Sequence, residues 1–170
     1  MIILGVDPGS WTTGFGLVEC EAGRTSYLAS GRIQAPAGAE LAVRLVHLAE
    51  ELQAILGRHR PALVAIEKPF HGVNSRSAIV LAEARGALLL TVARDGVVIE
   101  EYAPASVKSA VAGNGRADKG EVARMVRLQL GLAARPMGPD ESDALAVALC
   151  AAVQRPLRER LARSTAGVLR

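Results

Sequence analysis

Four acidic residues stand where strands are expected to end or a helix to begin. Asp7 closes the segment "IILGVD" and Glu67 closes "ALVAIE". Asp140 and Asp143, three residues apart in the first turn of an expected helix, project from one face of it. Carboxylate oxygens suit Mg²⁺ or Mn²⁺, whereas zinc favours Cys and His. Converging acids of this kind predict a site that holds two divalent ions and hydrolyses a phosphodiester.

Each acid also has an ordinary structural explanation. Asp is common at the start of a turn such as Pro8-Gly9, and acids are favoured in the first turn of a helix by its dipole. Each structural explanation is sufficient for its own residue. Without a metal site, however, all of these separate explanations must be true at once, whereas a shared site accounts for the four acids together. Glu141, between the two helical aspartates, is expected to point elsewhere and is left out.

The order of the expected elements decides whether the acids meet. Three strands with short connections predict an antiparallel meander, and the later strands alternate with helices. This order predicts an α/β fold with one five-stranded mixed sheet and helices on both faces. If the first and fourth strands pair in parallel, Asp7 and Glu67 converge at one edge. Strands are expected at 2–7, 14–18, 25–35, 62–67 and 97–102, and helices at 40–56, 74–93, 104–113, 119–130 and from 139.

Two of the expected helices carry further information. The helix at 74–93, with Asn74 as its expected cap, is apolar almost all round. Such a helix is either central to the monomer or meets a second subunit with one face. The helix that begins at Lys119 has Asp118 and Glu121 placed as a capping box. Its N-terminal amides attract phosphate, beside the glycine-rich stretch "GNGRADKGEV".

Composition sets the broad class of protein. A chain of 170 residues predicts one domain at 1–154, followed by a basic tail at 155–170 without fixed structure. The tail has five arginines against one glutamate, a net charge of +4; the whole chain is +3, so the preceding residues sum to −1. Charge alone is therefore weak support for DNA binding. No apolar run of membrane-spanning length and no secretory signal is seen, so a cytoplasmic protein with no membrane association is expected.

Five stretches together carry a family resemblance. From Met1 to about Val153 the chain resembles the bacterial RuvC Holliday-junction resolvases, with the motifs in the same order. The resemblance implies an RNase H-like fold, a homodimer, and nicking of four-way junction DNA with Mg²⁺ or Mn²⁺, two ions per active site. It also implies RuvA and RuvB as partners. The stretches are "ILGVDPGSWTTGFGLVE", "AIEKPF", "ARG" at 84–86, "VKSAVAGNGRADKGEV" and "DESDALAVAL".

The same resemblance assigns roles to individual residues. Asp7, Glu67, Asp140 and Asp143 match the catalytic, metal-binding acids of the family. Lys108 and Lys119 match lysines near the scissile phosphate, and Phe70 matches an aromatic that stacks on a base near the crossover. Stacking is worth roughly 1–3 kcal/mol per base, although Phe70 can equally tuck into the core. Asn74 and Arg76, in the polar stretch that follows, complete the DNA-binding candidates.

Two other classes of function share some of these features. Actin-like and sugar-kinase phosphotransferases also open with strand, turn and strand around Asp-x-Gly to bind nucleotide, but they need two such domains. A non-catalytic junction-binding protein would use the acids only for capping and solvation. Metal-dependent nicking, ATP turnover and binding alone distinguish the three classes.

Overall fold

Five strands form a single sheet in a computed structural model that describes residues 1–68 and 76–168, with 156–168 described by their backbone. The strand order is β3-β2-β1-β4-β5. Antiparallel pairs join β1 to β2 and β2 to β3, and parallel pairs join β1 to β4 and β4 to β5. The mixed sheet predicted from the sequence is confirmed. Its strands are β1 (Ile2–Asp7), β2 (Thr12–Glu21), β3 (Arg24–Gln34), β4 (Leu63–Glu67) and β5 (Val98–Tyr102).

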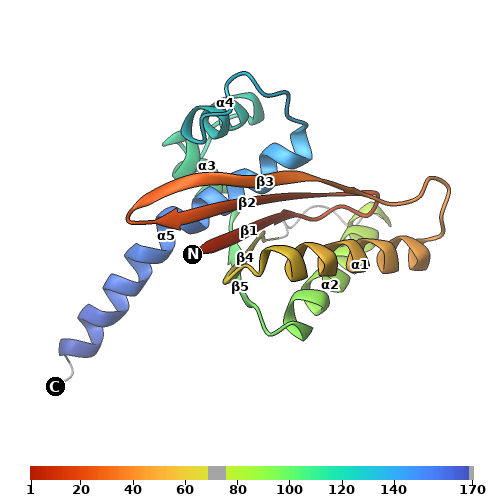
Figure 1. Cartoon of the computed structure of the whole chain (residues 1–170), viewed down its shortest axis with the longest axis horizontal. Coiled ribbons are helices and arrows are strands. Elements are labelled where there is room, and N and C mark those ends of the chain that lie inside the picture. Colours follow the sequence, from red (N-terminus) through yellow and green to blue (C-terminus); the bar gives the residue numbers. More distant parts are fainter. Residues whose placement is uncertain (69–75, 169–170) are drawn as a thin grey trace.

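Helices cover both faces of the sheet (Figure 1). The core is accordingly divided into two layers by the alternation of side chains along each strand. In β1, Ile3 packs with α3, α4 and α5, whereas Leu4 and Val6 pack with α1 and α2. Asp7, four residues after Ile3 in the same strand, points to the same side of the sheet and so lies on the α5 face. The helices are α1 (Leu41–His59), α2 (Arg76–Arg94), α3 (Pro104–Ala112), α4 (Lys119–Gln129) and α5 (Pro139–Val168).

The helix α5 touches the sheet backbone to backbone. A Cβ added to Gly5 in β1 would lie 2.0 Å from the Ala144 carbonyl oxygen, and one added to Gly14 in β2 would lie 2.0 Å from the Asp140 carbonyl oxygen. Neither position has room for a side chain. The glycines therefore set how closely α5 approaches, and with it where Asp140 and Asp143 stand.

The end of α1 differs from the sequence prediction by three residues. The helix α1 passes Gly57, the expected end, and stops at His59. A helical glycine costs only about 1 kcal/mol, and the left-handed residue that closes α1 is Arg60, with φ 46° and its N–H donating to the Leu56 carbonyl at 2.8 Å. The predicted cap of α2, Asn74, lies outside the described residues.

The C-terminal segment also differs from the prediction. Instead of an unstructured tail after residue 154, α5 continues to Val168 and runs away from the sheet (Figure 1). Residues 155–168 are rich in Arg, Leu and Ala, which favour helix. The domain boundary at 154 remains a prediction. No helix in the described parts of the chain is long and apolar enough to cross a membrane.

Candidate active site

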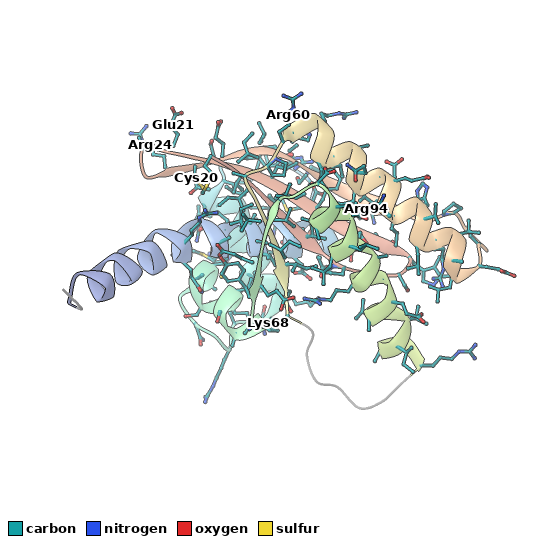
Figure 2. The ribbon with its side chains drawn as sticks, turned by 90° about the horizontal axis from the view of Figure 1, so that it is seen from below. Cys20, Glu21, Arg24, Arg60, Lys68 and Arg94 are labelled. Atoms are coloured by element: carbon teal, nitrogen blue, oxygen red, sulfur yellow. The ribbon has the colours of Figure 1, made fainter. Side chains whose placement is uncertain are left out.

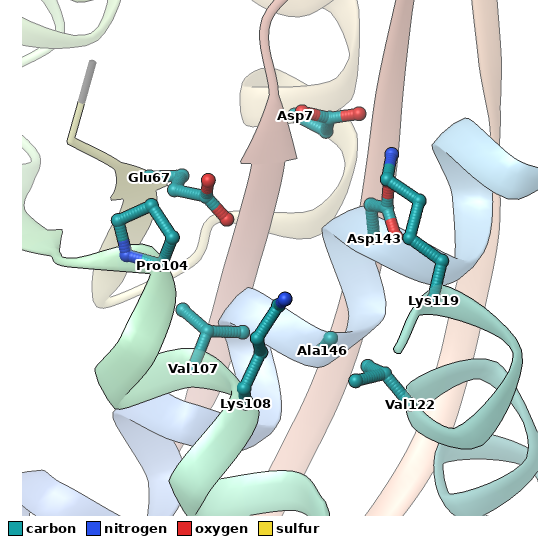
Figure 3. A pocket seen from close by; sticks show the side chains of 9 residues that line it. All are labelled: Asp7, Glu67, Pro104, Val107, Lys108, Lys119, Val122, Asp143 and Ala146. Carbon is teal, nitrogen blue, oxygen red and sulfur yellow. The ribbon is translucent and has the colours of Figure 1, made fainter. Parts of the chain in front are cut away.

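The carboxyl ends of β1 and β4 bring the first two acids together. In their parallel register Val6 lies beside Ile66, so the following residues, Asp7 and Glu67, stand at the same edge of the sheet. Asp143 from the first turns of α5 joins them in lining one pocket, toward which the three carboxylates turn (Figure 3). The meeting of distant acids that the sequence predicted is confirmed for these three residues.

Burial and neighbouring negative charges raise the pKa values of two carboxyl groups in this pocket. The pKa of Asp7 rises from 3.8 to about 7, chiefly because the carboxyl is buried and further because Asp143, Glu67 and Asp140 repel its charged form. Burial, followed by Asp143, also raises the pKa of Glu67. Carboxylates that repel one another in a partly dry site are stabilised by a cation between them.

Two lysines bring positive charge to the same pocket. The Lys119 Nζ donates to Asp143 Oδ2 at 2.9 Å, and this bond raises the pKa of the lysine. Lys108 reaches the pocket from α3, and both lysines oppose the rise in the pKa of Glu67 (Figure 3). The Asp118 side chain accepts from the Glu121 N–H at 2.8 Å, which confirms the predicted cap of α4. Lys119 is thus the first residue of a capped helix and lies against Asp143 (Figure 3).

Asp140 takes a less central position than the other acids. It does not line the pocket, although its charge still contributes to the raised pKa of Asp7. In residues 1–68 and 76–168, no three Asp, Glu, His or Cys side chains already stand where they could hold one metal ion. The donors nevertheless fit Mg²⁺ or Mn²⁺ in type and charge.

Glu141 points away from the pocket, as predicted, but it has a structural role that the sequence did not reveal. Only 8% of it is exposed; it accepts from Ser30 Oγ in β3 and pairs with Arg135 Nη2 at 2.8 Å. Arg135 also stacks over the Tyr27 ring, 5.1 Å from its centroid. The network ties the first turn of α5 to β3 and so helps to position Asp140 and Asp143.

Arg85 of α2 supports the other side of the site. Its Nη2 pairs with Glu101 of β5 at 2.5 Å, and its Nε lies 3.5 Å from the backbone oxygen of Glu67. The residue thereby links α2 and β5 to the end of β4, where Glu67 stands. The motif "ARG" at 84–86 was a signal for this residue, but the sequence alone gave it no role.

Of the remaining DNA-binding candidates, the structure describes only Arg76. Phe70 and Asn74 are outside the described residues, so their roles stay predictions. Arg76 is exposed at the start of α2; it does not line the acid pocket but a separate hollow, together with Trp11 and Arg44. Lys68, next to Glu67, marks the end of β4 in Figure 2.

Comparison with known proteins places this geometry in a family. The model of the family described as Crossover junction endodeoxyribonuclease RuvC matches residues 3–151. The chain belongs to this family. It is 45% identical over 150 residues to the RuvC of Syntrophomonas wolfei, and the aligned region covers 88% of this chain and 87% of that relative. It is 44% identical over 160 residues to the RuvC of Moorella thermoacetica, where the aligned region covers 94% of this chain and 96% of the relative.

Solved structures agree with the RuvC assignment. Thermus thermophilus RuvC superposes with a TM-score of 0.83 at 34% identity, over 92% of this chain and 96% of that one. The same protein in complex with a Holliday junction substrate gives a TM-score of 0.85, at the same identity and coverage. The fold is therefore the RNase H-like fold expected for a RuvC, and the protein is an endonuclease. Membership of the family also implies dependence on a divalent metal ion in general.

Proposed function

We propose that the protein resolves four-way (Holliday) DNA junctions in recombination and repair, by a pair of symmetric nicks. The observation that carries the proposal is the pocket in which acids from β1, β4 and α5 meet beneath Lys119. The resemblance of the whole chain to RuvC proteins supports the choice of substrate, since one of them is described in complex with a Holliday junction.

Asp7, Glu67, Asp140 and Asp143 are the residues that would hold the metal. Two Mg²⁺ or Mn²⁺ ions bound there would supply an activated water and neutralise charge at the phosphate. Hydrolysis then leaves a 5′-phosphate and a 3′-hydroxyl, ends that a ligase can seal. Because the pKa of Asp7 is raised to about 7, a cation competes with a proton for this carboxyl near and below pH 7. Cation affinity is therefore expected to fall as the pH drops below 7.

The chain's own cations orient the DNA. The side chain of Lys119 is 81% exposed and pairs with Asp143. It can leave this ion pair and bind an incoming DNA phosphate instead. Lys108 lies deeper in the same pocket. Positive charges fixed beside the reacting phosphate stabilise the negative charge that develops there. Phe70, Asn74 and Arg76 are proposed as further contacts to the junction.

A homodimer fits both the substrate and the surface of α2. Ile79 and Leu90 are 62% and 60% exposed, although both are large and apolar. They lie eleven residues apart, about three helical turns, and so share one face. Of the two alternatives for this helix, the exposure favours contact with a second copy. A four-way junction is approximately two-fold symmetric, and a symmetric dimer offers it two identical sites. RuvA and RuvB are proposed as partners in the cytoplasm.

The test is cleavage of a synthetic four-way junction. With Mg²⁺ or Mn²⁺ present, we expect two symmetric nicks in strands of like polarity, products that ligase reseals, and no cutting of a matched linear duplex. EDTA should abolish the reaction. Turnover of ATP would instead support a phosphotransferase, and tight junction binding without cutting under any divalent metal would support a purely architectural protein.

A further inference from the structure

A hollow separate from the acid pocket lies beside the turn that joins β1 to β2, between α1 and the start of α2. These two helices pack against each other on the face of the sheet away from α5 (Figure 1). We call it the Trp11 hollow. It is lined by Ser10, Trp11, Arg44, Arg76, Ser77 and Val80. Among the residues that the structure describes, this lining contains two arginines and no acid.

Arg44 is the unusual member of this lining. It is only 7% exposed, and its guanidinium carbon lies 3.8 Å from the centroid of the Trp11 ring. Its Nη1 donates to the Ser10 carbonyl oxygen at 3.2 Å. Its buried Nε has no hydrogen-bond partner within residues 1–68 and 76–168, and no carboxylate in those ranges pairs with it. A buried, uncompensated positive charge is costly unless an anion joins it.

The start of α2 adds a second source of positive potential. Arg76 and Ser77 are exposed in the first turn of this 19-residue helix, which contains no acidic residue in that turn. Two arginines and two serines therefore line one hollow. This is the chemistry that binds a phosphate group.

The hollow lies next to the acid site. Ser10 follows Asp7 by three residues, within the turn after β1. A third hollow is lined by Asp7 and Glu67 and also by Ala78 and Leu81, which follow Ser77 of the Trp11 hollow along α2. We therefore expect a DNA strand engaged at the acids to run along the turn toward Arg44.

We propose that the Trp11 hollow binds a backbone phosphate of the DNA strand being cut, near the nicked phosphate. The proposal rests on the proposed function, because it assumes that DNA lies across the acids. Arg44 and Arg76 bind the phosphate oxygens, and Trp11 stacks on the Arg44 guanidinium and holds it in place. Arginine suits this task because its planar fork meets two phosphate oxygens at once.

The only tryptophan in the chain is Trp11, so its fluorescence reports on the hollow directly. The experiment uses the full-length Asp7→Asn variant, which keeps the junction intact. Addition of a synthetic four-way junction should change the Trp11 emission. Junctions with a neutral methylphosphonate at one position at a time should then identify a single position near the cut at which the change is lost.

A matched pair of variants tests the binding energy. In the same Asp7→Asn background, Arg76→Ala should weaken junction binding by roughly 3–10-fold and reduce the slope of log K against log salt by about one unit. Arg94→Ala, at the other end of the same exposed helix, should change neither (Figure 2). In the Arg76→Ala variant, the critical methylphosphonate should cause no further loss.

Three results would overturn the proposal. The first is a junction that binds tightly while the emission and the salt slope stay unchanged in all variants. The second is an equal emission response to inorganic phosphate alone, which would mark a small-anion site. The third is a protein that neither binds nor cuts junctions, in which case the proposed function falls as well. The first two leave nicking of the junction by the unmodified protein intact, so the two failures are distinguishable.

Discussion

The helices α5 and α2 both border the acids, but they are held in opposite ways. In α5, residues 144–151 are buried without exception, and the helix lies directly on Gly5 and Gly14. In α2 only Ala84, Leu88, Thr91 and Val92 are buried, and large apolar side chains remain exposed. Catalytic acids need fixed positions, which backbone contact provides. A helix with free surface is instead suited to meeting DNA and a second copy of the chain.

The largest effect on the nicking rate is expected at the acid site, which α5 holds in place. Asp7→Asn should lower the nicking rate by at least about 10³-fold, equivalent to about 4 kcal/mol, because the cation site loses a central charge. Junction affinity should be retained, since the acid contributes no attraction to DNA. Single-turnover cleavage and a gel-shift assay measure the two quantities. Cutting at a rate close to that of the unmodified protein would remove Asp7 from the mechanism.

The same substitution should stabilise the metal-free protein. Folding raises the pKa of Asp7 from 3.8 to about 7, so the contribution of this group to stability is full below pH 3.8 and is lost as the pH rises through about 7. Asp7→Asn abolishes that loss. In EDTA at pH 8 the free energy of unfolding should rise by roughly 1–4 kcal/mol, with little change near pH 4. Equal urea midpoints for the two proteins at pH 8 would contradict the burial of this charge.

The next largest effect should follow from moving α5. Gly14→Ala places a methyl carbon only 2.0 Å from the Asp140 carbonyl oxygen, so the helix must shift and the nicking rate should fall by roughly 10²-fold. Gly57→Ala is the matched control, since nothing lies within 4 Å of its added Cβ. It should stabilise α1 by roughly 0.5–1 kcal/mol and leave cleavage unchanged. Similar losses of activity in both variants would mean that close packing of α5 does not position the acids.

Lys119 should give an intermediate effect, because it acts through charge and not through packing. Lys119→Ala should slow nicking by roughly 10-fold and lower the salt dependence of junction binding. Lys119→Arg, which keeps the charge, should restore much of both. The comparison of rates and salt slopes in the three proteins decides the point: an alanine variant with unchanged rate and slope removes Lys119 from the site.

The smallest effect on chemistry is expected on the exposed face of α2. Leu90→Glu should weaken the dimer at least 10-fold and replace paired nicks by single ones, because a charge would be buried at the interface. Each remaining nick should occur at a rate within a few-fold of normal at saturating protein. Leu128→Glu, equally exposed on α4, is the control. Sedimentation velocity checks the dimer, and an unaltered sedimentation profile for Leu90→Glu would place the interface elsewhere.

The sequence predicted the elements whose patterns are local. Short apolar runs at 2–7 and 62–67, each with an acid at its end, predicted the sheet edge and the positions of Asp7 and Glu67. It could not reveal that Gly5 and Gly14 are contact points for α5, because a glycine has no side chain whose pattern could be recognised. The pairing of Arg44 with Trp11 joins a helix to a distant turn, and only the folded chain shows it.

The end of α1 shows the same limit on a smaller scale. Gly57 is the expected stop by residue type, yet the left-handed position falls on Arg60, three residues later. The sequence therefore located the candidate acids but not the contacts that hold them. Glu141 is the clearest case, since its buried bonds to Ser30 and Arg135 depend on β3 and α5 meeting.

A crystal of the metal-free protein soaked in Mn²⁺ tests the central claim most directly. Anomalous scattering locates the metal independently of any assumption about cleavage. The account predicts anomalous density between the carboxylates of Asp7, Glu67 and Asp143, with Lys119 withdrawn from Asp143 and Asp140 turned toward the ions. Strong density elsewhere on the protein, with none at these carboxylates at saturating Mn²⁺, would contradict it.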